Sequence, residues 1–220
     1  MAAAHTIAVS THGRYLTEAP AADPTGLLIG CHGYGENADI QLERLRSVAG
    51  AGAWLLVSIQ GLHRFYRSRT DEVVASWMTR QDRECAIADN VAFVSAVVDE
   101  VASASRVESP LVFAGFSQGV AMAFRAACGS TRSVGGVIAV GGDVPPEIGR
   151  GELARIPIVL LARGERDEWY TAAKWTADQA RLRDAGVDVR AVAFDGGHEW
   201  HDAVNREAAA LLQRTGAHRV

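Results

Sequence analysis

The sequence predicts an α/β domain in which helices cover both faces of a mostly parallel central sheet. Apolar runs of strand length alternate with stretches whose apolar residues recur about every 3.6 residues, as in parallel βαβ units. Most of the strand-length runs are almost continuously apolar, which is expected of strands covered on both faces. The chain has 220 residues, 48% hydrophobic and 22% charged, so we expect one ordinary domain spanning residues 1–220.

Two kinds of strand signal are present. Thr6–Ser10 and Tyr15–Thr17 flank His12 and Gly13, which predicts an antiparallel hairpin at the N-terminal edge of the sheet. The last apolar run alternates apolar with polar residues, which favours a position near an edge. The apolar runs predicted as strands of the main sheet are Leu27–Cys31, Trp54–Ile59, Leu111–Gly115, Val134–Val140, Ile158–Ala162 and Val187–Phe194.

Helices are predicted from apolar periodicity and from residues typical of helix ends. No stretch of the size of a cap domain interrupts the alternation of strands and helices. Residues 60–80 form the longest region without clear periodicity, which predicts a functional or mobile loop. The predicted helices are Asn37–Ala49, ending before Gly50, a segment from the N-cap Asp82 to Ser105, a weaker one containing Trp175 and Leu182 that stops at Gly186, and one whose apolar stripe runs from Trp200 to Leu212.

Charge and cysteine content exclude several classes of protein. The net charge of −4 and the absence of any block of like charges argue against binding to nucleic acid or to an anionic membrane. The odd count of 3 cysteines, far apart in sequence, predicts neither a disulfide framework nor a zinc site. Residues 1–10 lack the features of a secretory signal, and no apolar run approaches the length of a membrane span. We therefore expect a soluble cytoplasmic protein.

One motif carries most of the functional information. Gly-x-Ser-x-Gly occupies residues 115–119, directly after the apolar run Leu111–Gly115 and at the start of a helical pattern. In this context it is typical of a nucleophile elbow, a strained turn in which the glycines let strand and helix approach closely. Ser117 is therefore the candidate nucleophile. The alternative is a serine that merely caps a helix after a turn.

A serine nucleophile requires a base, and the base requires an orienting acid. His198 follows the last predicted strand and is the candidate base, with His201 as its competitor. Asp167 follows the strand Ile158–Ala162 and is the candidate acid, because the chain order serine, aspartate, histidine is that of the α/β-hydrolase triad. Asp143, after the preceding strand, is the alternative acid.

Two backbone N–H groups are candidates for stabilising the oxyanion of a tetrahedral intermediate. One belongs to Gln118, the residue after the nucleophile. The second is that of Tyr34, in the glycine-containing segment that follows the strand Leu27–Cys31. The alternative for the His32-Gly33 pair in this segment is a simple turn.

On these residues the chain resembles the phospholipase/carboxylesterase family of α/β-hydrolases, lidless serine esterases that include acyl-protein thioesterases. The resemblance covers nearly the whole length and implies an α/β-hydrolase fold with no cap domain. It implies Ser117 as nucleophile, Asp167 as acid, His198 as base, and Tyr34 and Gln118 as main-chain donors. The motifs that carry it are His32-Gly33-x-Gly35, Gly115-Phe116-Ser117-Gln118-Gly119, Gly164-x-x-Asp167 and Gly197-His198.

The sequence departs from the family pattern around the expected acyl pocket. Many relatives have a second glycine where this chain has Val120, a His-Gly where it has Arg163-Gly164, and Pro and Val where it has 168–170. Arg64, Arg67 and Arg69 are expected to be solvated, with contact to an anionic substrate group as the alternative. The aromatic residues proposed to narrow the cleft, each with core packing as its alternative, are Phe65, Tyr66, Trp77, Trp169, Tyr170 and Trp200.

The leading hypothesis is a serine hydrolase that cleaves small carboxylic esters or thioesters through an acyl-enzyme, acting as a monomer or homodimer. We expect no organic cofactor. We also expect no metal, since His198 and His201 lack the glutamate of an HExxH motif and a third ligand. One alternative is a small peptidase or amidase with the same triad, and another is a non-catalytic ligand-binding protein on a hydrolase scaffold.

Overall fold

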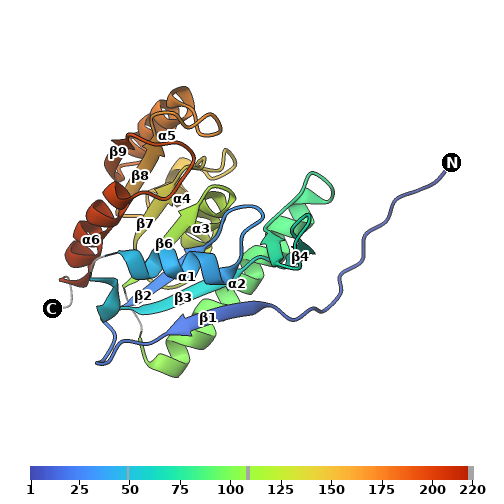
Figure 1. Cartoon of the computed structure of the whole chain (residues 1–220), viewed down its shortest axis with the longest axis horizontal. Helices are drawn as coiled ribbons and strands as arrows, with labels where there is room; N and C mark the ends of the chain where they lie inside the picture. Colours follow the sequence, from blue (N-terminus) through green and yellow to red (C-terminus); the bar gives the residue numbers. More distant parts are fainter. Residues whose placement is uncertain (49, 108–109, 218–220) are drawn as a thin grey trace.

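The structure, a computed structural model, describes residues 1–48, 50–107 and 110–217. Its main feature is a 7-stranded sheet in the order β1-β3-β2-β6-β7-β8-β9 (Figure 1). Neighbouring strands are parallel except β1, which is antiparallel to β3. The strands are β1 (Arg14–Glu18), β2 (Leu27–Cys31), β3 (Leu55–Gln60), β6 (Leu111–Phe116), β7 (Val134–Val140), β8 (Ile158–Gly164) and β9 (Asp188–Phe194).

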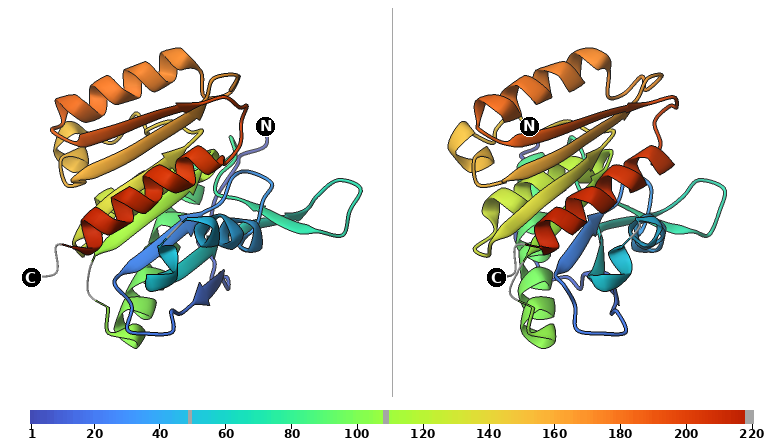
Figure 2. Two further views of the ribbon diagram at one scale, coloured as in Figure 1. Left: turned by 60° about the vertical axis from the view of Figure 1, so that its left-hand side comes forward. Right: turned by 90° about the vertical axis from the view of Figure 1, so that its left-hand side faces the viewer.

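Helices cover both faces of this sheet, as the sequence predicted. One face packs against α1 and α6, and the other packs against α2, α3 and α5 (Figure 2). Within β2, for example, Leu27 and Ile29 enter one core and Leu28 enters the other, which explains why the strand is apolar throughout. The helices are α1 (Ala38–Ser47), η1 (Ala51–Ala53), α2 (Arg83–Ser105), α3 (Gln118–Gly129), α4 (Arg150–Leu153), α5 (Ala172–Asp184) and α6 (Asp202–Gly216).

The strand order reverses its direction between β2 and β6. From β2 the chain passes through α1 to β3 on one side, whereas from β6 it passes through α3 to β7 on the other. The two connecting helices pack on opposite faces of the sheet, so the direction in which the chain winds reverses between β2 and β6. In open α/β sheets such a switch point is where ligands bind.

The N-terminal edge differs from the predicted hairpin. Residues 6–10 form no strand and are exposed, and β1 pairs instead with β3. A two-residue hairpin turn requires positive φ, but Gly13 does not have it. Instead, glycine at position 13 leaves room for the ring of Phe93, because a Cβ at Gly13 would lie 2.1 Å from that ring.

An antiparallel hairpin is present elsewhere, within the region predicted to be a long loop. Strands β4 (His63–Tyr66) and β5 (Val73–Ser76) pair in an arm that projects from the domain (Figure 2). Only β5 is largely buried. Its Ala75 pairs with the loop after β2: Gly35 N–H donates to Ala75 O at 3.0 Å, and Ala75 N–H donates to Glu36 O at 2.7 Å. The arm is thus attached to the loop that was expected to hold the oxyanion.

Helix ends agree with the predictions apart from a few details. Asn37 caps α1 by accepting from Ile40 N–H, while Ala49 lies outside the described residues. Asp82 precedes α2, but its side chain makes no capping hydrogen bond. His201 is the N-cap of α6, so it lies before this helix and not inside it. None of the described helices combines the length and apolar character needed to cross a bilayer.

Candidate active site

Ser117 sits at a sharp turn between β6 and α3. Its backbone has φ 51° and ψ −120°, an unfavourable region for a residue with a side chain. The backbone at the end of β2 approaches the start of α3 so closely that only glycine fits at position 119. A Cβ at Gly119 would lie 2.1 Å from Cys31 O and 2.5 Å from His32 O. Strand, helix and the loop after β2 therefore meet around the serine, as expected of a nucleophile elbow.

Three side chains that are far apart in sequence form one hydrogen-bonded chain at this elbow. His198 Nε2 lies 2.8 Å from Ser117 Oγ, and His198 Nδ1 lies 2.8 Å from Asp167 Oδ2. A carboxylate only accepts, so Nδ1–H donates to Asp167 and leaves Nε2 as the acceptor for the serine hydroxyl. This arrangement is the one needed to remove the serine proton.

The loop after β8 fixes the orientation of the Asp167 carboxylate. Its second oxygen, Oδ1, accepts the backbone N–H groups of Trp169 and Tyr170, each at 2.9 Å. The side chain is 1% exposed, whereas that of His198 is 24% exposed. The carboxylate is therefore held by three donors and shielded from water, while the imidazole keeps access to solvent.

The two alternative residues lie elsewhere. Asp143 is exposed and pairs with Lys174 at 3.2 Å, so it does not orient the histidine. His201 stacks on Phe194 with ring centroids 4.8 Å apart, and its Nδ1 accepts from Ala203 N–H. Within the described residues, no three His, Cys, Asp or Glu side chains are grouped so as to hold a metal ion.

The loop after β2 carries the first of the two candidate oxyanion donors. Within the described chain, neither Tyr34 N–H nor Gln118 N–H donates to another protein group. The Gln118 N–H is at the first turn of α3, where backbone N–H groups have no partner in the helix. Both donors are thus available to a ligand, and the helix N-terminus favours negative charge there.

Glu36 and Arg44 hold this loop in shape. Gly33 N–H donates to Glu36 Oε2 at 2.7 Å, and both carboxylate oxygens accept from Arg44 at 2.6 Å. Burial acts to raise the pKa of Glu36, but Arg44 and the Gly33 N–H outweigh it and lower the pKa. Arg44 also lies 4.1 Å from the ring centre of Phe116, whose other neighbour is His198.

His32 lies fully buried beneath the same loop. Its Nε2 accepts from Gly61 N–H at 3.0 Å, so its Nδ1–H donates to Gly33 O at 2.6 Å. Burial lowers the pKa of His32 to about 4. The imidazole is therefore neutral near pH 7 and acts as a fixed link between the loops after β2 and β3.

The side chain of Gln118 joins the elbow to the arm. Its Oε1 accepts from Trp77 N–H at 2.9 Å and its Nε2 donates to Met78 O at 3.0 Å. Trp77 Nε1–H in turn donates to His32 O at 2.8 Å. Sequence reasoning had assigned Gln118 only its backbone N–H and gave no role to Glu36 or Arg44, whose charges lie in segments that look like ordinary loop and helix surface.

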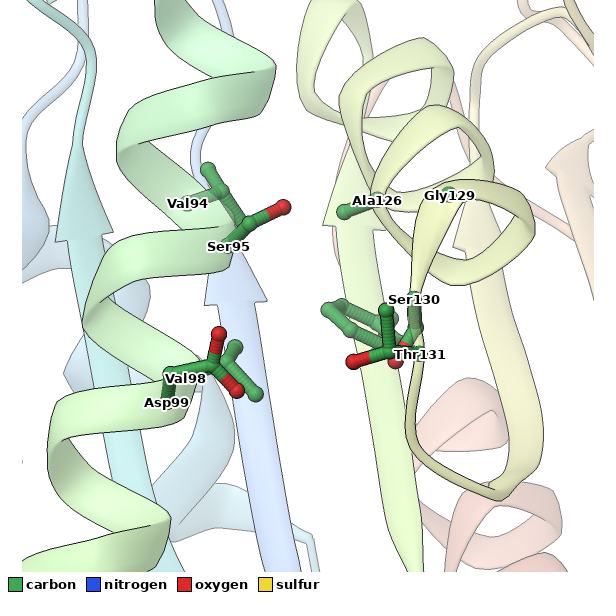
Figure 3. Close-up of a pocket in the computed structure, with 9 residues that line it drawn as sticks. Val94, Ser95, Val98, Asp99, Ala126, Gly129, Ser130 and Thr131 are labelled. Atoms are coloured by element: carbon green, nitrogen blue, oxygen red, sulfur yellow. The ribbon is translucent and has the colours of Figure 1, made fainter.

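Two cavities flank His198. One, of about 320 Å³, is bounded by Ser117, Gln118, His198 and the loop after β7. The other is an open groove of about 640 Å³ between α1 and the start of α6, and it reaches His198 but not Ser117. A smaller cavity of about 60 Å³ lies apart from the elbow, between α2 and the end of α3 (Figure 3). Its one carboxylate, Asp99, pairs with Arg132.

The aromatic residues proposed for the pocket separate into three groups. Trp169 and Tyr170 line the cavity beside Ser117, with Trp169 76% exposed and Tyr170 buried. Tyr170 O–H donates to Asp178 Oδ2 at 2.9 Å, and burial raises the pKa of both groups. Trp200 lines the groove beyond His198. The remaining residues are not in the lining of either cavity: Phe65 and Tyr66 are exposed on the arm, and Trp77 is fully buried.

Comparisons with known proteins identify the family and the fold of this chain. The model of the family described as phospholipase/carboxylesterase matches residues 12–213, whereas no curated protein matches the sequence. A solved carboxylesterase from Mesorhizobium loti is 20% identical with a TM-score of 0.76, covering 91% of this chain and 94% of that one. The Bacillus cereus carboxylesterase is 16% identical with a TM-score of 0.71, covering 92% and 94%. Arabidopsis thaliana SOBER1 is 16% identical with a TM-score of 0.69, covering 86% and 98%. At these identities the structural matches establish the shared fold.

Proposed function

Since this chain belongs to the phospholipase/carboxylesterase family, we propose that it is a serine hydrolase that cleaves small carboxylic esters or thioesters. The observation that carries the proposal is the hydrogen-bonded chain from Asp167 through His198 to Ser117, with both contacts at 2.8 Å. The solved carboxylesterases of Bacillus cereus and Mesorhizobium loti, which share this fold, support the same chemistry. The N–H groups of Tyr34 and Gln118, which have no partner among the residues that the structure describes, add the donors that such a reaction requires.

The reaction proceeds in two halves. Ser117 Oγ attacks the carbonyl carbon as His198 Nε2 takes the hydroxyl proton, and Asp167 stabilises the imidazolium that forms. The oxyanion accepts from the N–H groups of Tyr34 and Gln118. The ester or thioester bond then breaks, and His198 protonates the alcohol or thiol that leaves. The acyl group remains bonded to Ser117 Oγ. Water, deprotonated by His198, finally releases the acid and restores Ser117.

The two cavities suggest how substrate lies across the elbow. The cavity of about 320 Å³ touches Ser117 and suits the acyl group, which stays bound to this residue in the intermediate. The groove touches His198 but not Ser117 and suits the leaving group, which receives its proton from the imidazole. The groove is open to solvent, so we expect the leaving group to be loosely specified.

Removal of Oγ tests the proposal. Ser117→Ala should lower kcat for p-nitrophenyl esters by at least about 10⁴-fold and abolish labelling by an organophosphonate. Ser133→Ala is the matched control, because Ser133 is exposed and lies before β7, at the far end of the sheet. A folded Ser117→Ala protein that turned over esters at the wild-type rate would falsify the nucleophile assignment. Matched p-nitroanilides measure any amidase activity of the same site.

A further inference from the structure

The cavity beside Ser117 is unusual in its charge. Arg83, Arg125 and Lys174 line it, against the single lining carboxylate of Asp143. Lys174 pairs with Asp143 at 3.2 Å, and Arg125 pairs with Glu147, which lies just outside the lining. Arg83 is exposed and forms no ion pair within the described residues. Even with both carboxylates counted, the cavity retains an excess positive charge.

Arg125 is the buried member of this set. Its side chain is 5% exposed, and Nε and Nη2 both donate to one oxygen, Glu147 Oε1, at 2.8 and 2.5 Å. Its Nη1 has no hydrogen-bond partner within the described chain. A buried guanidinium donor without an acceptor is costly, and Arg125 keeps its positive charge in spite of this cost. Arg125 therefore places a positive charge in the wall of the cavity, and its ion-pair partner Glu147 is 50% exposed to solvent.

The helix aligns this group with the nucleophile. Ala121 and Arg125 are four residues apart on one side of α3, Ser117 is the N-cap of this helix, and all three line the cavity. Eight residues of helix span roughly 12 Å, and helical side chains lean towards the N-terminus, which shortens the gap between guanidinium and Oγ. The small Ala121 leaves the space between them open. This geometry fits a short acyl chain attached to Ser117 at one end and anionic at the other.

We propose that the cavity binds acyl groups that end in a carboxylate, so that the substrates are monoesters or monothioesters of short dicarboxylic acids. This inference rests on the proposed function. The ester or thioester bond breaks as before, water enters the product acid, and the remote carboxylate stays chemically unchanged while it pairs with Arg125 and Arg83. The open groove at Trp200 receives the leaving group and has no part in this selection.

The test compares two esters with acyl chains of equal carbon number, p-nitrophenyl hemiglutarate and p-nitrophenyl pentanoate. The wild-type ratio of kcat/KM, charged over neutral, should be about tenfold or more in favour of the hemiglutarate, as expected of charge-assisted hydrogen bonds. Arg125→Met and Arg83→Met should each lower this ratio. Raising NaCl from about 0.05 M to about 0.5 M should lower it as well, because Arg83 is exposed.

Arg132→Met is the matched control, since Arg132 pairs with Asp99 away from the elbow and should leave the ratio unchanged. If circular dichroism shows that Arg125→Met does not fold, the kcat/KM ratio of Arg83→Met and its dependence on NaCl in the wild type test the inference instead. Hydrolysis of the pentanoate by Ser117 with no preference for the hemiglutarate overturns this inference and leaves the proposed function standing. A preference unaltered in both arginine variants also overturns it. Failure of the folded wild type to hydrolyse either ester overturns the proposed function itself.

Discussion

Replacing Asp167 by asparagine distinguishes orientation of the base from simple burial of a polar group. In the wild type, Oδ1 accepts two backbone N–H groups and Oδ2 accepts His198 Nδ1–H. Asparagine has one amide oxygen, which takes the place facing Trp169 and Tyr170. Its NH₂ group then faces the imidazole, and two donors cannot share one hydrogen bond. His198 must therefore move its proton from Nδ1 to Nε2.

The magnitude follows from the tautomer. With hydrogen on Nε2, the imidazole donates to Ser117 Oγ and no longer accepts its proton, so the general base is lost. The loss expected for a wrong tautomer in such a triad is about 10⁴-fold in kcat. This corresponds to about 5.5 kcal/mol of transition-state stabilisation. By contrast, Asp143 is 53% exposed and forms only a surface ion pair with Lys174, so Asp143→Asn should cost less than about fivefold.

The assay is the initial rate of p-nitrophenyl pentanoate hydrolysis, with circular dichroism to show that each variant is folded. The rate of organophosphonate labelling of Ser117 is a second readout and should fall in parallel, because it needs the same base. The reasoning is refuted if folded Asp167→Asn retains more than about a tenth of wild-type kcat, or if Asp143→Asn suffers the loss expected of Asp167→Asn.

Three further predictions concern stability around the elbow. His32 has a folded pKa of about 4 against 6.5 unfolded, so the unfolded chain binds more protons between these values, and about 3 kcal/mol of unfolding free energy should be lost as pH falls from 6.5 to 4. Urea titrations across that range should show a shallower pH dependence for His32→Gln, and equal slopes would contradict it. Ser117→Gly should raise the unfolding free energy by about 1–3 kcal/mol by relieving the positive φ of 51°, whereas Ser117→Ala keeps the strain, so identical melting temperatures for the two would refute this. Gly119→Ala should lower the unfolding free energy by about 1–3 kcal/mol or more and impair turnover, because its Cβ would lie 2.1 and 2.5 Å from backbone oxygens. Gly129→Ala is the control and should do neither, because the space around its Cβ is open. Calorimetry that found both variants as stable as the wild type would argue against this packing explanation.

The sheet and the meeting of the three candidate side chains were predictable because both depend on local patterns combined with one topological rule. Continuous apolar runs mark strands covered on both faces, and parallel strands end at the same edge. Ser117 and Asp167 follow β6 and β8, and His198 follows β9, so the fold brings them to that edge. Chain order does not separate Asp167 from Asp143, since both lie between Ser117 and His198. The choice of Asp167 rested on the strand that it follows and on the Gly164-x-x-Asp167 motif, and the hydrogen bond to His198 is a contact that no sequence pattern specifies.

The N-terminal hairpin and the arm were mispredicted for related reasons. Residues 6–10 alternate like a strand, but an alternating pattern does not specify a pairing partner, and the ring of Phe93 occupies the space beside Gly13. Strand β4 is exposed along its whole length, so it has no apolar face for periodicity to detect. Arg125 did leave a signal, because a charge in the otherwise apolar run of residues 119–128 is unusual on a helix covering a sheet.

The buried polar groups around the elbow explain how a region without periodicity acquires a fixed structure. His32, Ser76 and Asn90 are each 1% exposed or less, and burial of such groups is unfavourable unless their hydrogen bonds are made. Asn90 Nδ2 donates to Trp77 O and its Oδ1 accepts from Leu62 N–H, while Ser76 O–H donates to Met78 O. Any rearrangement of the arm would leave several of these groups unpaired at once, so the network favours one arrangement over the alternatives. The same network holds the peptide group between Gly33 and Tyr34 through His32, and it holds Gln118 through its side chain. The residues that specify the arm therefore also position the two candidate oxyanion donors, the N–H groups of Tyr34 and Gln118.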